Sequence, residues 1–213
     1  MASRSRNLRS NIRSSRRRME REHEVRFRRA EPATVERDFT TLLDLHRRRW
    51  AERGEPGAIP TWSEPFHRAF AAAAAARGWL RLHVLELDGT PAAAWYGWRH
   101  GSRTYFYQSG FDPAMAHFGL GALMLAHTIE EAAGEGAAVY DMLWGDEGYK
   151  SRFATGRREA TSLLLVRRTD PIGRSLAAAT TVIDRARNLP PRVKKPMQRL
   201  RGRLALGRQR VGR

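Results

Sequence analysis

The spacing of hydrophobic residues changes from a helical to a strand pattern near residue 79. Before that point, apolar residues recur every three or four positions over 33–54, as on one helical face, and a second helix is predicted over 64–77 with Thr61 or Ser63 as its cap. From residue 79 the pattern alternates, in three runs over 79–87, 92–100 and 103–111 that the turn sequences "DGTP" and "GS" separate. These three runs predict an antiparallel meander.

The remaining elements surround this meander in the sequence. An alternating run over 24–30 predicts a strand before it, and an apolar stretch over about 117–133 predicts a helix after it. The expected order then continues with a buried strand over 137–144, a short helical turn over 146–154, a last strand over 159–168 and a helix over 171–188. The predicted fold class is α+β, with one mixed, mostly antiparallel sheet flanked by helices.

The amino-acid composition excludes several kinds of functional site. The chain has 213 residues, enough for one well-buried domain, and no cysteine, which excludes disulfides, thiolate metal sites and a cysteine nucleophile. The seven histidines show no ligand spacing, so we predict no metal site. The longest small apolar run, over 69–76, is too short to span a membrane, and the N-terminus lacks the apolar core of a secretory signal. We therefore expect a cytoplasmic protein.

The net charge of +17 is concentrated at the two ends. Residues 1–30 carry +8 and residues 185–213 carry +11, which leaves −2 over 31–184. We expect a basic linker or helix over 1–23 that packs little, a folded domain over 24–187 and a basic tail over 188–213. Basic ends of this kind suit contact with nucleic acid or with an anionic membrane, which would place the protein at the inner membrane face.

The stretch "SGFDPAMAHFGLGALMLAHTI", residues 109–129, places Gly119 and Gly121 at the start of an apolar helix. A phosphate can approach backbone N–H groups closely where side chains are missing, and the helix N-terminus adds partial positive charge. The alternative is that both glycines only permit tight packing at a helix start. The Gly-x-Gly spacing alone is a weak signal and favours the packing role.

Several stretches in sequence order resemble the GNAT acetyltransferase superfamily: "LHRRRW", "GWLRLHVLELDGTPAAAWYGW", "YFYQSGFDP", "GLGALML" and "YDMLWGDEGYKSRFATG". More narrowly, the chain is similar to the CelD-like acetyltransferase domain of cellulose biosynthesis proteins, a relative of the Fem-type aminoacyltransferases. The resemblance covers about residues 24–168. Members are typically longer, so this chain resembles their C-terminal half and a partner half would precede it.

The resemblance implies an acyltransferase that uses acetyl-CoA or another acyl-CoA as co-substrate. The pyrophosphate would lie on the backbone amides of Phe118, Gly119, Leu120, Gly121 and Ala122. The usual glycine loop begins with Gln or Arg where this chain has Ala116, so the amides would bind without that side chain. The acceptor would be an amine or hydroxyl of a small molecule or glycan precursor. The alternative function is a scaffold that binds polyanions through its basic ends.

Three residues are candidates for catalysis. Tyr149 lies where many GNAT enzymes place the tyrosine that protonates the departing thiolate, although it could also be an aromatic plug at the end of the sheet. Asp141 is the first candidate for general base, because an acid in an apolar strand must face a cleft or find a buried partner. Lys150 could stabilise an oxyanion or pair with the pyrophosphate. Asp112, before Pro113, is more typical of a turn residue.

Aromatic residues alternate along two neighbouring strands of the meander. Most should lie in the core or on the sheet face, while one or two could line an acceptor groove. These residues are Trp95, Tyr96, Trp98, Tyr105, Phe106 and Tyr107.

Overall fold

The fold is taken from a computed structural model of the whole chain. It describes residues 6–159 except 53, 55, 56 and 146, and five separate residues beyond them, 161, 171, 173, 175 and 178. The chain divides into two units, Met1–Gly156 and Arg157–Arg213, and the sheet lies in the first. The strand expected over 159–168, the helix expected over 171–188 and the basic tail over 188–213 fall almost wholly outside the described residues.

One five-stranded sheet forms the centre of the first unit, with the strands in sequence order. Strands β1 (Val25–Arg29), β2 (Leu80–Leu87), β3 (Thr90–His100) and β4 (Arg103–Phe111) pair antiparallel, and β5 (Val139–Asp141) joins β4 in parallel. The predicted meander and the mixed, mostly antiparallel sheet are therefore confirmed. The strand expected over 137–144 is shorter than predicted, because Leu143 has a φ of 54° and the extended backbone cannot continue through it.

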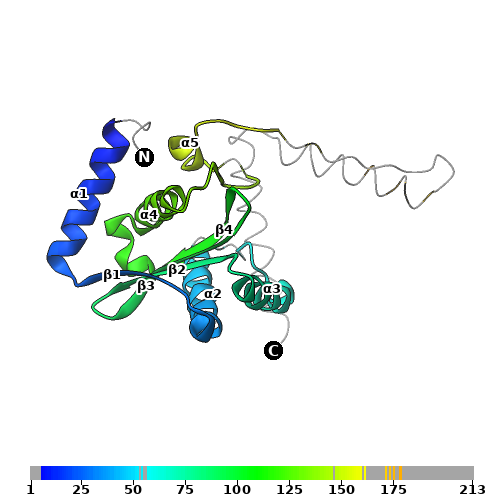
Figure 1. Cartoon of the computed structure of the whole chain (residues 1–213), viewed down its shortest axis with the longest axis horizontal. Coiled ribbons are helices and arrows are strands. Elements are labelled where there is room, and N and C mark those ends of the chain that lie inside the picture. Colours follow the sequence, from blue (N-terminus) through cyan, green and yellow to red (C-terminus); the bar gives the residue numbers. More distant parts are fainter. Residues whose placement is uncertain are drawn as a thin grey trace, which may run out of the picture. The chain divides into compact units, whose positions relative to one another are not determined.

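Helices cover both faces of this sheet (Figure 1). Helices α2 (Val35–Ala51) and α3 (Glu64–Ala76) lie on one face, while α1 (Arg6–Glu22), α4 (Leu120–Gly134) and α5 (Lys150–Phe153) contribute to the core on the other. The side chains of β3 alternate between the two faces of the sheet, so this strand contributes to the hydrophobic core on each face. Trp95 packs toward α4 and Tyr96 packs toward α2.

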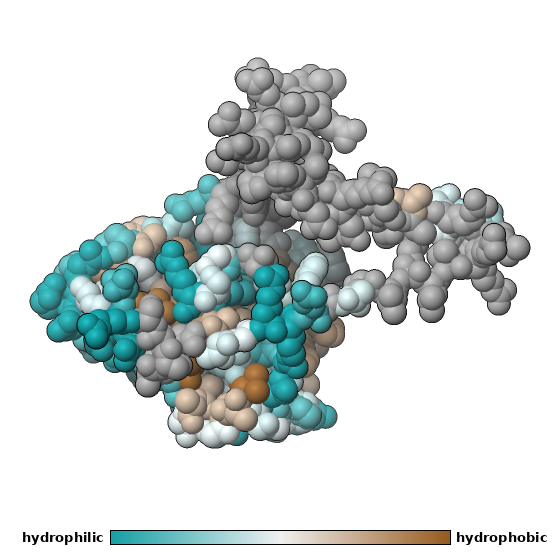
Figure 2. Space-filling view, turned by 90° about the horizontal axis from the view of Figure 1, so that it is seen from above, coloured by the Kyte–Doolittle hydropathy of each residue, from teal (hydrophilic) through white to brown (hydrophobic). Residues whose placement is uncertain are grey.

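Helix α1 packs more closely than its composition indicates. Met19 is fully buried, and Leu8 and Ile12 pack against the same core. These residues lie four and seven positions apart, so they share one helix face. The arginines fill the rest of the surface, and the edge of the molecule where α1 lies is mostly hydrophilic in Figure 2.

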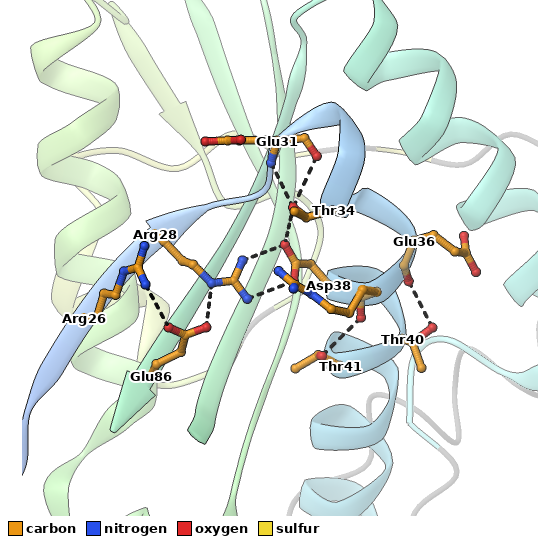
Figure 3. A network of polar contacts seen from close by, with 10 residues as sticks. Arg26, Arg28, Glu31, Thr34, Glu36, Asp38, Thr40, Thr41 and Glu86 are labelled. Carbon is orange, nitrogen blue, oxygen red and sulfur yellow. Dashed lines mark hydrogen bonds and ion pairs between the residues drawn. The ribbon is translucent and has the colours of Figure 1, made fainter. Parts of the chain in front are cut away.

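A buried ion-pair network attaches α2 to the sheet (Figure 3). Arg28 of β1 donates two hydrogen bonds to Asp38, at 2.6 and 2.9 Å, and a third to Glu86, at 2.6 Å. Asp38 has no exposed surface. Burial by itself would raise the pKa of Asp38, but hydrogen bonds from Arg28 and Thr34 outweigh it and lower the pKa. The network fixes the start of α2 relative to β1 and β2.

None of the described helices is both long and apolar enough to cross a membrane.

Candidate active site

Strands β4 and β5 separate after a short parallel pairing. Only residues 103–105 of β4 pair with β5, so among the described residues the β5 side of positions 106–111 has no strand partner. A bulge in β4 follows directly after the residues that pair with β5. Tyr96 pairs with Gln108 and Gly97 with Phe106, which leaves Tyr107 as an extra residue. The bulge places Phe106 and Ser109, three positions apart, on the same face.

A pocket of about 280 Å³ lies between this part of β4 and the N-terminus of α4. Its lining has an apolar part, a polar part and a part made by the loop and helix start. The apolar residues are Trp95, Phe106, Phe111, Leu125 and Phe153, the polar residues are Arg49, Ser109 and Tyr149, and the helix start contributes Ala116, Gly119, Leu120, Gly121 and Ala122.

The chain enters α4 through a capped 3₁₀ segment, Pro113–Phe118. Asp112 caps this segment by accepting a hydrogen bond from the N–H of Ala114 at 3.0 Å, with Pro113 at the first position. Gly119 then takes a φ of 70°, so it ends the 3₁₀ segment and begins α4. A residue with a side chain would be strained in this conformation. Asp112 thus has the turn role that its sequence favours.

The backbone amides at the start of α4 divide into two groups. The N–H of Gly119 donates to the carbonyl of Ala116 at 2.9 Å, and that of Ala122 donates to the carbonyl of Gly119 at 3.0 Å. Within the described part of the chain, the N–H groups of Leu120 and Gly121 have no acceptor. Two amides at the pocket are therefore available to an anion, where the sequence suggested five consecutive positions.

Gly119 and Gly121 differ in what a side chain at each position would disturb. A Cβ on Gly119 would lie 3.8 Å from Ser15 Oγ, and a Cβ on Gly121 would lie 3.7 Å from the ring of Phe111. Both distances are ordinary van der Waals contacts, so packing against the described residues requires glycine at neither position. The backbone conformation requires it at Gly119 alone. At Gly121 the missing side chain leaves space in the pocket.

Tyr149 lines the same pocket, at the N-terminal end of α5. It is 36% exposed. Burial and the negative charge of Glu147 raise its pKa to about 12, and Arg49 partly opposes them. The phenol is therefore protonated at neutral pH and available as a proton donor.

The other candidates from the sequence do not line the pocket. Asp141 accepts a hydrogen bond from the N–H of Leu143 at 2.9 Å and lies 3.9 Å from Arg103. The Lys150 ammonium group donates to the carbonyl of Trp144 and pairs with Glu147, at 2.9 and 2.8 Å.

The side chain of Phe118 also lies away from the pocket, fully buried beside Arg18 and His23. Of the two acids that follow β5 in the sequence, Glu147 pairs with Lys150, and Asp146 lies outside the described residues.

Arg49 is a pocket residue that the sequence did not single out. It extends from α2 and donates to Ser109 Oγ at 3.1 Å, with its guanidinium 4.8 Å from the Phe111 ring centre. Its helical position is the signal that could have identified it, because it continues the buried face of Leu42 and His46, whereas Arg47 and Arg48 are exposed.

Gly110 lets α2 approach β4 closely enough for this contact. A Cβ there would lie 2.2 Å from the backbone nitrogen of His46. The Nδ1 of His46 lies 3.1 Å from the carbonyl oxygen of Ser109, while Nε2 accepts a hydrogen bond from the N–H of Ala58 at 3.2 Å. Burial lowers the pKa of His46, which favours the neutral ring.

Comparison with solved structures finds the same fold. FemX aligns with a TM-score of 0.52 and 12% identity over 69% of this chain and 50% of FemX. A GCN5-related N-acetyltransferase from Ralstonia eutropha aligns with a TM-score of 0.49 and 18% identity, over 66% of this chain and 96% of that protein. A GNAT family acetyltransferase from Brucella melitensis, solved with acetyl-CoA, aligns with a TM-score of 0.48 and 18% identity, over 68% of this chain and 97% of that protein.

No curated protein sequence matches the chain. The family model of the Acetyltransferase (GNAT) domain, in contrast, matches residues 6–151, which include the whole sheet and every described pocket residue except Phe153. Because this match covers well over half of the sequence, the chain belongs to the GNAT acetyltransferase domain family.

Proposed function

We propose that this chain transfers an acyl group, with acetyl as the first candidate, from acyl-CoA to an amine or hydroxyl acceptor. The acceptor nitrogen or oxygen attacks the thioester carbonyl carbon, so that a C–N or C–O bond forms and the C–S bond breaks. The thiolate of CoA leaves and is protonated, and the acceptor loses one proton. Family membership and the pocket beside the start of α4 support this reaction.

The observation that carries the proposal is the open space at Gly121. Neither a left-handed backbone nor contact with a described residue requires glycine there, yet its N–H has no described acceptor and its α-carbon lines the pocket. A phosphate needs such an approach to a helix N-terminus. We assign the pyrophosphate to the N–H groups of Leu120 and Gly121, with Phe118, Gly119 and Ala122 shaping the loop.

Tyr149 is the proposed donor of the proton that the thiolate takes up. Its phenol, with a pKa raised to about 12, is protonated at neutral pH, and it lines the pocket that would hold the thioester. No carboxylate lines the pocket among the residues that the structure describes. Therefore we propose that the acceptor proton leaves to solvent, and we do not retain Asp141 or Lys150 in this reaction.

The family resemblance in the sequence also suggests a type of enzyme and an acceptor. We propose a CelD-like enzyme that acts on a sugar or cell-envelope precursor and works with a second GNAT-like half. The alignment with 50% of FemX, which shows the fold alone at 12% identity, is compatible with one half of a two-half protein. An acetylation assay with an amino sugar and the same sugar bearing a hydroxyl would separate N-transfer from O-transfer.

Calorimetric titration with acetyl-CoA tests the binding site. We expect binding by the parent chain and its loss in Gly121→Glu, because the added carboxylate would enter the pocket beside the phosphates. Gly121→Gln separates charge from size. Gly134→Glu is the matched control, since it adds the same side chain to the other end of α4, where a Cβ meets nothing within 4 Å. Absence of binding by the parent, or equal binding by both glutamate variants, would refute the assignment.

A further inference from the structure

A second polar cluster lies on the α4 face of the sheet, with no residue on the pocket wall. His83 comes from β2, and His127 and Glu131 come from α4. The Oε2 atom of Glu131 lies 3.1 Å from Nδ1 of His83 and 3.5 Å from Nε2 of His127. We propose that these three residues bind a divalent transition-metal ion, with Zn²⁺ as the best fit.

Regular secondary structure brings the three side chains together. His127 and Glu131 are four residues apart, so they share one face of α4. Alternation along β2 places His83 on the same side as Leu85 and Leu87, which belong to the core beneath α4. The three candidate ligand atoms all lie within 4.8 Å of one another. This His-x-x-x-Glu pair with a distant histidine has no spacing that the sequence alone would reveal.

His83 provides an independent observation that points to a ligand. It is 3% exposed, and its Nδ1 has no hydrogen-bond partner among the described residues, although Glu131 Oε2 lies nearby. A buried polar atom without a partner is destabilising, and in native structures a water or ion often supplies the missing partner.

The charges around the cluster are divided between two glutamates. Glu135 forms ion pairs with three arginines: Arg29 at 2.6 Å, Arg81 at 2.9 Å and Arg99 at 3.5 Å. Of the described arginines, only Arg29 lies within ion-pair distance of Glu131, at 3.7 Å from Oε1. The oxygen that faces the two histidines is therefore Oε2, and Glu135 compensates the positive charges that would otherwise repel an ion. Arg16, which faces His127 from α1, pairs with Glu20.

The separations suit zinc. Zinc binds histidine nitrogen and carboxylate oxygen at about 2.0–2.2 Å, so tetrahedral ligand atoms lie about 3.3–3.5 Å apart. The separations of Glu131 Oε2 from the two histidine nitrogens, 3.1 and 3.5 Å, lie close to this value. His127, whose side chain is 28% exposed, can turn to close the third separation and leaves a position for water. Magnesium and calcium prefer oxygen ligands and fit two imidazoles poorly.

Bound zinc would fix α4 to β2, and thus the helix whose first residues line the pocket. Zinc titration of the tag-free full-length chain, after removal of metal with a chelator, tests this at pH 7.5. We expect one zinc per chain and a higher melting temperature with zinc. His127→Gln and Glu131→Gln should each lose at least about 100-fold in zinc affinity, since even the loss of a group that only hydrogen-bonds to a metal ligand costs about 10–100-fold. His100→Gln, at an exposed histidine outside the cluster, should bind zinc normally.

Two results would overturn the proposal: no zinc binding by the parent chain, or binding that survives both cluster variants. Circular dichroism of each variant shows whether it folds, and the partly exposed His127 is the substitution that disturbs the core least. Cobalt adds a direct signal, because tetrahedral Co²⁺ gives intense visible absorption bands that the cluster variants should lack. These readouts require no catalysis, so they stand whether or not the proposed acyl transfer is correct.

Discussion

Gly110 of β4 is the position where a single methyl group should disturb both the fold and the pocket. An added Cβ would lie 2.2 Å from the backbone nitrogen of His46 and 2.5 Å from the carbonyl carbon of Leu45. Both atoms belong to the backbone of α2, so no side-chain rotation relieves the contact. Lengthening the shorter distance to 3.4 Å, the lower limit of an ordinary contact, moves α2 by about 1.2 Å.

The shift has a stability cost and a functional cost. Overpacking of this kind destabilises proteins by about 1–3 kcal/mol. Arg49 lies one turn beyond His46 on the same helix, so its 3.1 Å contact with Ser109 should lengthen past hydrogen-bond range. A displacement of about 1 Å near a reacting group can cost about 100-fold in rate. We therefore expect Gly110→Ala to lower both the free energy of unfolding and kcat.

Urea unfolding and a CoA-release assay measure the two effects. Gly134→Ala is the control, because its Cβ meets nothing within 4 Å and alanine should stabilise the end of α4 by about 0.5–1 kcal/mol. Acetyl-CoA affinity should change less than kcat in Gly110→Ala, since the amides of α4 do not belong to the displaced helix. A variant as stable and active as the parent would show that α2 does not rest on β4 as described.

Three further predictions concern proton donation, the ion pair and pH. Tyr149→Phe should lower kcat by about 100-fold or more with little change in acetyl-CoA affinity, whereas Tyr105→Phe, outside the pocket, should match the parent in the same assay. Arg28→Met should cost about 3–5 kcal/mol at pH 7, because it removes two hydrogen bonds from the buried Asp38 and leaves this carboxylate with Thr34 and the largely exposed Arg37. The pKa of Asp38 is lower in the folded state than in the unfolded state, so the stability from this pair is complete above pH about 4 and is lost as pH falls through the lowered pKa. The free energies of unfolding of parent and variant, measured in urea, should therefore become similar in acid. With an amine acceptor, kcat/KM should rise with pH until the pH reaches the pKa of the acceptor itself. A plateau that begins near pH 5, as a carboxylate base would produce, would contradict the absence of a base from the described pocket wall.

The sequence predicted what depends on local periodicity. Helices α2, α3 and α4 and the three strands of the meander follow from hydrophobic spacing and turn residues, and they lie close to the predicted bounds. The tertiary position of α1 did not follow, because Leu8, Ile12 and Met19 are too few to stand out among its arginines. Three apolar residues at helical spacing are nevertheless enough to bury one face.

The candidate site was predictable where one chain segment makes it. Gly119 and Gly121 stand together in the sequence, and family resemblance adds Tyr149. Arg49 and Ser109 meet only because Gly110 admits α2 and because the bulge at Tyr107 changes the alternation of β4. The metal-ligand cluster depends in the same way on β2 lying beneath α4. Contacts between distant segments depend on sheet register, which local patterns do not specify.

The early end of β5 is what leaves room for the pocket. If residues 137–144 had continued as a strand, as their apolar character predicts, positions 106–108 of β4 would have gained a neighbour and the space beside Phe106 would be filled. Asp141 prevents this, because its carboxylate accepts the N–H of Leu143 and favours a turn, in which Leu143 takes a φ of 54°. An acid in an apolar strand therefore does have a functional consequence here, but through the backbone. It opens the edge of the sheet at which the proposed acyl transfer takes place.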